Sequence, residues 1–311
     1  MLKVVKAVLW FSSISVVAGL ALAFIFLHPH SRTITSSDLQ KANGLGILEP
    51  LDIAPLSGWL IRHPEDHLPT IVLTHGRSSN RMQMFPLGES LFKRGFNVVL
   101  WDLPYHGDSG GSATYGQHEI RDLLRVVKTI SLNPAVDAHR VSLIGFSLGA
   151  AVTIGAAASD EQCLISAVVA DSPYASLRET AHWYVRLYGN IPEPVVWPTA
   201  AITVGVGSWL SRLDVDRLNP RDWAANVRVP ALIIQGAFDR QVNPDSGREI
   251  FNRLPMTKEF WLVPNAGHTD AFHNNPQLYS DRVSKFLSQQ AFRASAECVP
   301  ELPAEAGLIA R

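Results

Sequence analysis

The stretch that decides the fold is VSLIGFSLGAA, residues 141–151. An apolar run leads into Gly-Phe-Ser-Leu-Gly, and small residues that suit a helix start follow. A serine at a sharp strand-to-helix turn is the sequence form of a nucleophile elbow, which holds the hydroxyl clear of the sheet. Because the turn is tight, the positions two before and two after the serine must be small, and they are Gly145 and Gly149. We therefore take Ser147 as the candidate nucleophile, although a plain turn can also contain a serine.

The composition indicates one sizeable globular domain. Of the 311 residues, 47% are apolar and 18% are charged, and α/β folds of this length often stay single. The 27 basic and 28 acidic side chains nearly cancel, and no basic stripe points to nucleic acid as a partner. Two cysteines, Cys163 and Cys298, are too few for a disulfide framework or a cysteine metal site, and their spacing does not indicate whether they pair.

The N-terminus contains an uncharged run, residues 7–27. At about 1.5 Å per residue this run spans roughly 30 Å, the thickness of the hydrocarbon core of a bilayer. Lys3 and Lys6 precede it, so the positive-inside rule places the N-terminus in the cytoplasm and the rest of the chain outside it. We expect residues 1–28 to be a single-pass anchor, with the membrane as a partner through residues 7–27.

The alternative for this segment is a signal peptide that is cleaved to release a secreted protein. Signal peptides have an apolar region of about 7–15 residues that ends in a small-x-small site. Here the run is longer and closes with FIFLHP, residues 24–29, which is poor cleavage chemistry. Residues 18–23 could supply an earlier site. The anchor is the favoured interpretation.

The remainder of the chain alternates apolar strands with helical segments. Continuous apolar runs are typical of buried parallel strands, and regular alternation with helices indicates the α/β class with a largely parallel sheet. Strands are expected at residues 56–62, 70–74, 97–101, 140–146, 164–170, 231–235 and 259–263. Helices are expected at residues 82–94, 117–132, 150–158, 244–253 and 275–289.

The domain boundaries follow from breaks in this alternation. Residues 29–50 look like a polar stalk, and residues 51–290 form the main domain. Residues 172–229 contain no clear strand and are rich in tryptophan, tyrosine and proline. Such a long connection is usually functional or disordered, and its aromatic composition predicts a small helical cap rather than an ordinary loop. Residues 291–311 are rich in Ala, Glu and Pro, and we expect a disordered tail.

A nucleophilic serine needs a base, and the base needs a carboxylate that orients it. His268 follows a strand within Asn-Ala-Gly-His, and Asp239 lies just past another strand end. Functional groups in open α/β sheets gather at the carboxyl ends of strands. Asp239 could instead be a turn residue, and Asp171 is a rival acid at a neighbouring strand end. His273, in an expected helix, is a weaker candidate for the base.

An acyl-transfer serine also needs backbone N–H groups directed at the oxyanion. One should come from Leu148, the residue after the nucleophile. The other should come from the loop after residue 74, where Arg77 is the first choice and Ser78 the second. We expect His75 to brace this loop. The loop of residues 102–111 should pack beside it without taking part in a catalytic step.

Five motifs occur in an order that resembles the α/β-hydrolase superfamily. The resemblance covers roughly residues 51–290 and is closest to the membrane-anchored serine hydrolases of the BEM46-like and ABHD-type group. It implies the α/β-hydrolase fold and serine hydrolase activity, in a group that includes lysophospholipid, monoacylglycerol and protein-thioester hydrolases. The motifs are His75-Gly76, the Asp-x-Pro-x-His-Gly-x-Ser-x-Gly loop at 102–111, Gly-Phe-Ser-Leu-Gly at 145–149, Gly236-x-x-Asp239 and Gly267-His268.

The residues themselves point to the same mechanism, in which Ser147 forms an acyl-enzyme with the help of His268 and Asp239. No metal or organic cofactor is expected. An aromatic cap and a membrane anchor together favour a carboxylic ester of a lipid-like or medium-chain acyl group. A peptidase or amidase, whose substrate amine could bind Glu179 or Glu193, and a thioesterase are the alternatives. A non-catalytic binding protein is the least favoured alternative, because all three candidate triad residues are present.

Overall fold

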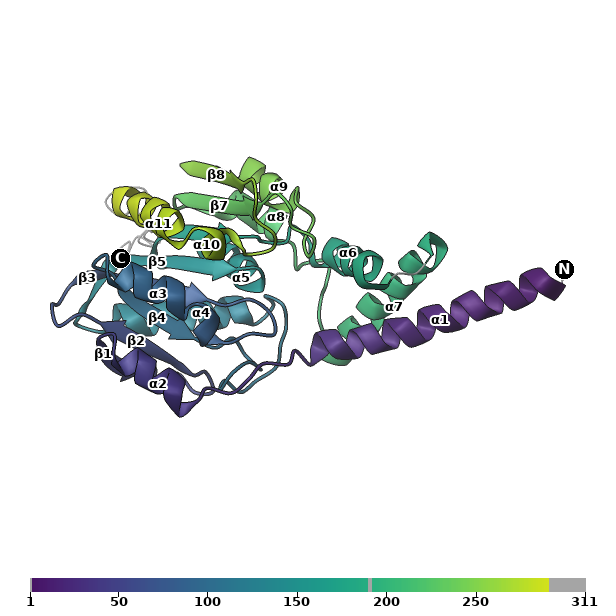
Figure 1. The fold of residues 1–311 in the computed structure, drawn as a ribbon, viewed down its shortest axis with the longest axis horizontal. Helices are drawn as coiled ribbons and strands as arrows, with labels where there is room; N and C mark the ends of the chain where they lie inside the picture. Colours follow the sequence, from purple (N-terminus) through teal and green to yellow (C-terminus); the bar gives the residue numbers. More distant parts are fainter. Residues whose placement is uncertain (1, 190–191, 291–311) are drawn as a thin grey trace, which may run out of the picture.

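The structure is a computed structural model that describes residues 2–189 and 192–290, and the expected tail at 291–311 lies outside this range. One eight-stranded sheet runs through the body in the order β1-β2-β4-β3-β5-β6-β7-β8 (Figure 1). β1 and β2 pair in antiparallel fashion, as do β2 and β4, and the other neighbours are parallel. The strands are β1 Ile47–Pro50, β2 Gly58–Arg62, β3 Leu68–Thr74, β4 Asn97–Trp101, β5 Val136–Phe146, β6 Ile165–Asp171, β7 Ala231–Gly236 and β8 Lys258–Val263.

Helices cover both faces of this sheet and bury two apolar layers. One layer packs α4, α5 and α9 on the sheet, and the other packs α3, α10 and α11 on the opposite face. The amphipathic α4, for example, buries Leu123, Val127 and Ile130 and leaves Arg121, Arg125 and Lys128 outside. The helices of the body are α2 Ser36–Asn43, α3 Phe85–Phe92, α4 Glu119–Ser131, α5 Leu148–Ala158, α9 Ser246–Arg253, α10 Ala271–Asn274 and α11 Pro276–Gln290, with a 3₁₀ turn at Arg81–Gln83.

The fold class predicted from the sequence is confirmed, including the largely parallel sheet. The seven expected strands are all present, with β5 beginning earlier and β2 shorter than expected. The polar stalk expected at residues 29–50 is wrong for residues 36–50. These residues fold into α2, whose Thr35 cap accepts a hydrogen bond from the Asp38 N–H, and into β1, which pairs with β2. The sheet gains an edge strand because Leu48 and its neighbours can pair with the exposed edge of β2.

Between β6 and β7 the chain forms helices and no strand among the described residues. This connection contains α6 Leu177–Gly189, α7 Glu193–Ser211, α8 Pro220–Trp223 and a 3₁₀ turn at Ala224–Asn226. We call residues 172–229 the cap. Figure 1 shows α6 and α7 standing away from the sheet, beyond the carboxyl ends of its parallel strands.

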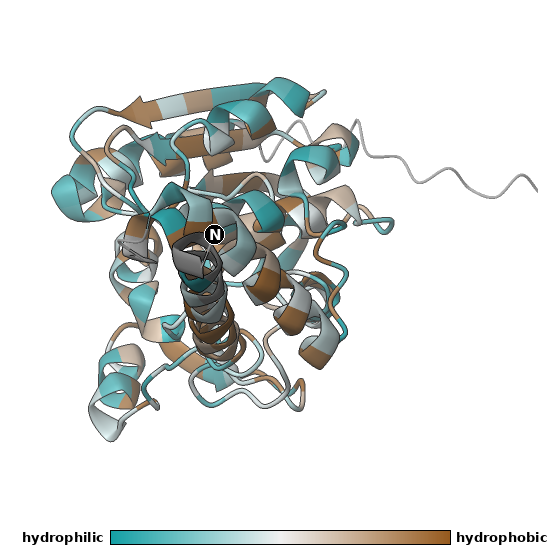
Figure 2. Ribbon diagram, turned by 90° about the vertical axis from the view of Figure 1, so that its right-hand side faces the viewer, coloured by the Kyte–Doolittle hydropathy of each residue, from teal (hydrophilic) through white to brown (hydrophobic). Residues whose placement is uncertain are grey.

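The N-terminal helix α1, Leu2–Leu27, is the one helix among the described residues that is long and apolar enough to cross a membrane. It extends from the body as a single rod, and α7 leans on the part nearer to the body (Figure 1). Figure 2 looks along this rod from its N-terminal end, with the body behind it. A signal sequence would pass the same test of length and hydropathy, so the helix itself does not decide the topology.

Candidate active site

Ser147 lies at the turn between β5 and α5, in the middle of the sheet. Its backbone has φ 54° and ψ −113°, a region that costs a non-glycine residue about 1–3 kcal/mol. The glycines on either side make this turn possible. A Cβ on Gly145 would lie 2.2 Å from the Gly149 carbonyl oxygen, and one on Gly149 would lie 2.3 Å from that of Thr74. The backbone is therefore packed too closely for any side chain at these two positions.

The structure brings the three residues predicted to act together into one hydrogen-bonded chain. The Ser147 Oγ and His268 Nε2 atoms are 2.8 Å apart, and His268 Nδ1 is 2.8 Å from Asp239 Oδ2. The three side chains come from loops after β5, β8 and β7, and the His268 side chain is only 8% exposed. A hydroxyl, an imidazole and a carboxylate in this order can move a proton from serine to histidine while the carboxylate fixes the tautomer.

Asp239 is held in place by four hydrogen bonds. Its Oδ1 accepts the backbone N–H groups of Gln241 and Val242, at 2.9 and 3.0 Å. Its Oδ2 accepts from the Gln235 side-chain amide at 2.9 Å and from His268. Asp239 is therefore both the turn residue that the sequence allowed and the imidazole's partner, because its two oxygens serve the two purposes separately.

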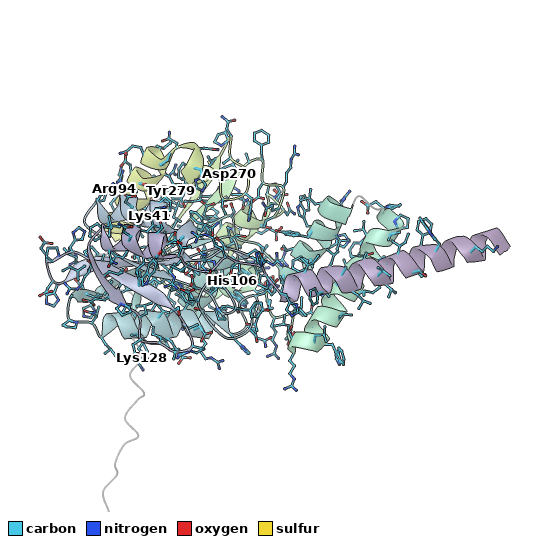
Figure 3. The ribbon with its side chains drawn as sticks, turned by 60° about the horizontal axis from the view of Figure 1, so that its bottom comes forward. Lys41, Arg94, His106, Lys128, Asp270 and Tyr279 are labelled. Atoms are coloured by element: carbon cyan, nitrogen blue, oxygen red, sulfur yellow. The ribbon has the colours of Figure 1, made fainter. Side chains whose placement is uncertain are left out.

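The rival acid, Asp171, has other partners. Its oxygens accept hydrogen bonds from the Ser172 hydroxyl at 2.9 Å and from the Tyr279 hydroxyl at 3.0 Å. The carboxyl is fully buried, and this burial raises its pKa to about 6. Figure 3 labels Tyr279, which approaches Asp171 from α11. Asp171 thus ties α11 to the end of β6 and is not hydrogen-bonded to His268.

Two backbone N–H groups close to Ser147 are left without an acceptor among the described residues. Leu148 is the first residue of α5, where an N–H has no intrahelical acceptor. In the loop after β3, the Gly76 N–H donates to Gln83 Oε1 at 2.8 Å and the Ser78 N–H donates to His106 Nε2 at 3.2 Å. The N–H of Arg77, between them, is the free one. The second choice from the sequence, Ser78, is therefore wrong, because its N–H is already used.

Neutral histidines brace this loop. His75 Nε2 accepts the Leu103 N–H at 3.0 Å, and its Nδ1 lies 2.7 Å from the Gly76 carbonyl oxygen, to which it donates. Burial lowers the pKa of His75 to about 3, so the imidazole keeps one donor and one acceptor. His106 is similar, since its Nε2 accepts from Ser78, its Nδ1 faces the Pro104 carbonyl, and burial lowers its pKa. The expected bracing role of His75 agrees with these contacts.

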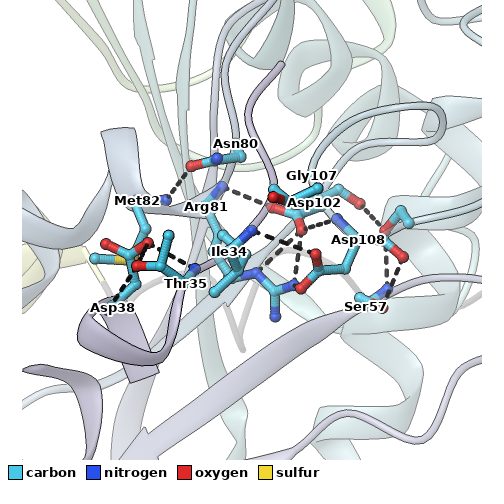
Figure 4. A network of polar contacts seen from close by, with 12 residues as sticks. Ile34, Thr35, Asp38, Ser57, Asn80, Arg81, Met82, Asp102, Gly107 and Asp108 are labelled. Atoms are coloured by element: carbon cyan, nitrogen blue, oxygen red, sulfur yellow. Dashed lines mark hydrogen bonds and ion pairs between the residues drawn. The ribbon is translucent and has the colours of Figure 1, made fainter. Parts of the chain in front are cut away.

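A buried ion pair fixes the loop of residues 102–111 beside this site (Figure 4). Arg81 and Asp102 are both at most 2% exposed and lie 2.8 Å apart. The Asp102 carboxylate also accepts the backbone N–H groups of Arg81 and Asp108. A second bond from Arg81 reaches Asp108 at 2.7 Å. Because each charge is paired and hydrogen-bonded, the two loops are locked together rather than left to move independently.

The Arg77 side chain connects the site to the end of α1. Its guanidinium donates to the Tyr115 hydroxyl at 2.9 Å and to the Ile25 carbonyl at 2.5 Å, and it lies 4.9 Å from the centre of the Phe26 ring. The Tyr115 hydroxyl in turn donates to the Phe26 carbonyl. Carbonyls at a helix C-terminus favour a cation. The last turn of α1 is thus in contact with the loop after β3, which carries the free N–H of Arg77.

Several of these supporting residues escaped the sequence analysis. Gln83, Gln235 and Tyr279 carry no motif of their own, and His106 was assigned only to a turn. The one available signal was the Asp-x-Pro-x-His-Gly pattern around His106, which marks a turn but does not say what its imidazole touches. His273, the weaker candidate for the base, is exposed on α10. Among the described residues, no group of three His, Cys, Asp or Glu side chains is arranged to hold a metal ion.

The chain is also similar to known proteins. Residues 71–282 match the model of the alpha/beta hydrolase family. Protein YqkD of Bacillus subtilis is 25% identical over 228 residues, which cover 72% of each chain. Protein Rv2307c of Mycobacterium tuberculosis is 26% identical over 248 residues, which cover 79% of each chain.

A solved structure is also similar. The esterase Pf2001 of Pyrococcus furiosus aligns with a TM-score of 0.68 and 27% identity, over 85% of this chain and 98% of the esterase. The similarity therefore extends over nearly the whole esterase and most of the chain analysed.

Proposed function

This chain belongs to the alpha/beta hydrolase family, and on that premise we propose that it is a serine hydrolase that cleaves carboxylic esters. The observation that carries the proposal is the hydrogen-bonded chain from Ser147 through His268 to Asp239, with both distances at 2.8 Å. The likeness to an esterase supports the same reaction class.

The chemistry would run in two halves. Ser147 Oγ attacks the ester carbonyl and transfers its proton to His268 Nε2, while the free N–H groups of Leu148 and Arg77 hold the oxyanion. The tetrahedral intermediate collapses as His268 protonates the leaving alcohol, which gives an acyl-enzyme. A water molecule then attacks the acyl carbonyl, again deprotonated by His268, and the acid leaves with Ser147 restored. Asp239 stabilises the imidazolium in both halves.

We propose an apolar acyl group as the substrate moiety. Its support is a cavity of about 40 Å³ between the end of α1 and the cap, lined almost wholly by apolar side chains, among them Phe26, Leu177 and Val215. Tyr115 also lines this cavity, and its hydroxyl binds Arg77. The apolar lining suits a lipid-like or medium-chain acyl group in its chemistry. The cavity itself is too small for such a chain, so the cap would have to move away from α1 to admit it.

An amidase that binds a substrate amine has less support. The two cap carboxylates that could bind an amine are each paired with an arginine. Glu179 lies 3.2 Å from Arg221, and Glu193 lies 3.0 Å from Arg186. A carboxylate already neutralised in this way attracts a second cation weakly.

The test is a panel of p-nitrophenyl esters of graded acyl length, with matching thioesters and aminoacyl amides, on the full-length protein in detergent. We expect medium or long acyl esters to have the highest kcat/KM, and a fluorophosphonate probe to label the native chain. Ser147→Ala should abolish both hydrolysis and labelling, whereas Ser131→Ala, on the outer helix α4, should change neither.

Each contrary result has a distinct meaning. A folded native chain that neither hydrolyses an ester nor takes the probe would overturn the serine hydrolase assignment. Preference for acetate esters would remove the lipid-like substrate and leave the reaction class in place. Faster cleavage of amides or thioesters would move the protein to those classes with the same triad.

A further inference from the structure

The cap helix α7 has an unusual surface for a helix of a soluble domain. Between Glu193 and Arg212 the sequence contains no charged residue, a distance of about 27 Å along a helix. Trp197, Trp209 and Leu210 point outwards and are 68%, 78% and 56% exposed. Large apolar side chains gathered on one exposed element usually mark a surface that something else covers.

The covered side of α7 packs on α1 through small residues. Ser15, Gly19 and Ala23 follow one another at four-residue spacing on α1, and Ser15 and Ala23 are at most 2% exposed. A Cβ on Gly19 would lie 2.6 Å from the Ile202 Cγ2 atom, so the backbones approach closely. The Thr203 hydroxyl donates to the Thr199 carbonyl within α7 at 2.8 Å and shares this hydrogen with the Gly19 carbonyl across the helix pair at 3.3 Å.

The facing residues on α7 have the same character, with Thr199, Thr203 and Gly207 also at four-residue spacing. Thr199 is fully buried, and Gly207 lines the cavity that Ala23 also lines. Small residues at four-residue spacing on both helices, with a hydroxyl bond between them, are the packing pattern of helices in lipid.

The outer surfaces of the two helices are alike and adjacent. On α1, Val17, Leu20 and Phe24 are 68%, 47% and 64% exposed. The contact with α7 runs from Gly19, which meets Ile202 and Thr203, to Leu27, which lines the cavity with Gly207. This rise of about 12 Å lies within the hydrocarbon depth of one leaflet, half of roughly 30 Å. Any bilayer that surrounds this half of α1 would therefore also meet α7.

We propose that α7 is a second membrane-contacting element, which lies in the leaflet nearer to the body and is held there by α1. The partner is a lipid bilayer, with Trp209 as an aromatic contact at the interface near the body and Trp197 deeper in the leaflet.

Arg212 ends the uncharged segment on the side of the body, where its carbonyl accepts a hydrogen bond from Gln117. At the other end Glu193 lies 3.0 Å from Arg186, so the charge there is paired. The proposal concerns the cap and the membrane and does not depend on the reaction at Ser147.

The test measures depth in the full-length protein and not membrane binding, because a membrane-spanning α1 would by itself keep any variant on the membrane. Leu210→Cys is labelled with an environment-sensitive fluorophore in proteoliposomes that contain nitroxide-labelled lipids. The matched control is Leu132→Cys, at the far end of α4 and 77% exposed, and the reference is Leu20→Cys on α1. The native chain, treated identically, gives the background from its own cysteines.

We expect the label at 210 to be quenched by lipid nitroxides as strongly as the label at 20, and to be shielded from an aqueous quencher. The label at 132 should show the opposite pattern. If position 210 behaves like position 132, the proposal is wrong. If 210 is shielded from both quenchers, a protein rather than lipid covers α7, and the proposal is equally overturned.

A second pair of variants tests the role of α1. In the Leu210→Cys background, Gly19→Leu should separate the two helices and reduce lipid quenching at position 210. Val17→Leu, on the exposed side of α1, should leave the quenching unchanged. Unchanged quenching in Gly19→Leu would contradict the claim that packing on α1 holds α7 in the bilayer.

Discussion

The elbow between β5 and α5 and the cap between β6 and β7 are both strand-to-helix connections at the same edge of the sheet, yet they are held in different ways. At the elbow, a Cβ on Gly145 or Gly149 would meet backbone atoms at 2.2–2.3 Å. In α7, a Cβ on Gly205 would meet nothing within 4 Å. The reacting atoms are thus fixed by backbone packing that leaves no freedom, whereas the cap has room and relies on a contact with α1.

The largest expected effect is a difference in kcat/KM between a variant of the Asp239 carboxylate, next to the elbow, and a variant of the Glu179 carboxylate, in the cap. Asp239→Asn should lower kcat/KM for an ester by about 10⁴-fold, because the imidazole loses the acceptor that fixes its tautomer. Glu179→Gln in the cap should leave kcat/KM nearly unchanged. Steady-state kinetics on both variants measure the difference. An active Asp239→Asn variant alongside an inactive Asp171→Asn variant would transfer the acid role to Asp171.

Gly149→Ala should strongly destabilise the fold. Its methyl group would lie 2.3 Å from the Thr74 carbonyl oxygen, and overpacking of this kind costs about 3 kcal/mol or more in the free energy of unfolding. Denaturant unfolding in detergent, followed by tryptophan fluorescence, would measure the loss. A variant of native stability would show that the elbow can relax, and the contrast with the cap would then fail.

Asp171, at the end of β6 where the cap begins, should make the stability of the fold depend on pH. Burial gives its carboxyl a pKa of about 6 in the folded chain, against 3.8 for an ordinary aspartate, so the folded state holds its proton more tightly than the unfolded state does. The stability that Asp171 contributes is complete below pH 3.8 and is lost as the pH rises through 6, by about 3 kcal/mol in all.

Asp171→Asn removes this titration. Relative to the native chain, the unfolding free energy of the variant should therefore rise by up to about 3 kcal/mol between pH 4 and pH 7.5. Asparagine also loses a hydrogen bond to Tyr279 or Ser172, but this loss is the same at both pH values. It therefore cancels in the difference between the two unfolding free energies. A pH-independent difference between the two chains would contradict the buried, proton-holding state of Asp171.

The smallest expected effect lies in the cap. Gly205→Ala should raise the free energy of unfolding by about 0.5–1 kcal/mol, because alanine favours the helix and meets no neighbour. The same unfolding assay applies, with Gly149→Ala as the opposite extreme. Destabilisation at Gly205 would indicate that the cap packs more tightly than the structure describes.

The sequence by itself determined the elements and the identity of the candidate catalytic groups. The strands are buried apolar runs, and helices such as α4 have an amphipathic period; both are local patterns. Gly145 and Gly149 flank Ser147 because the sharp turn excludes a side chain at either position. The order of Ser147, Asp239 and His268 follows from strands that all end at one edge of a parallel sheet. These features could be predicted because each depends on sterics within a few residues or on a repeated topology.

Tertiary structure decided what depends on contacts between distant segments. Asp239 rather than Asp171 meets His268, because Tyr279 from α11 occupies the Asp171 carboxylate. Arg77 rather than Ser78 keeps a free N–H, because His106 from another loop takes the Ser78 donor. Residues 36–50 joined the body because the edge of β2 needed a partner. A polar group forms a hydrogen bond with whichever partner the fold brings near, and the local sequence does not specify that partner. The cap likewise packs on α1, some 180 residues away in the chain.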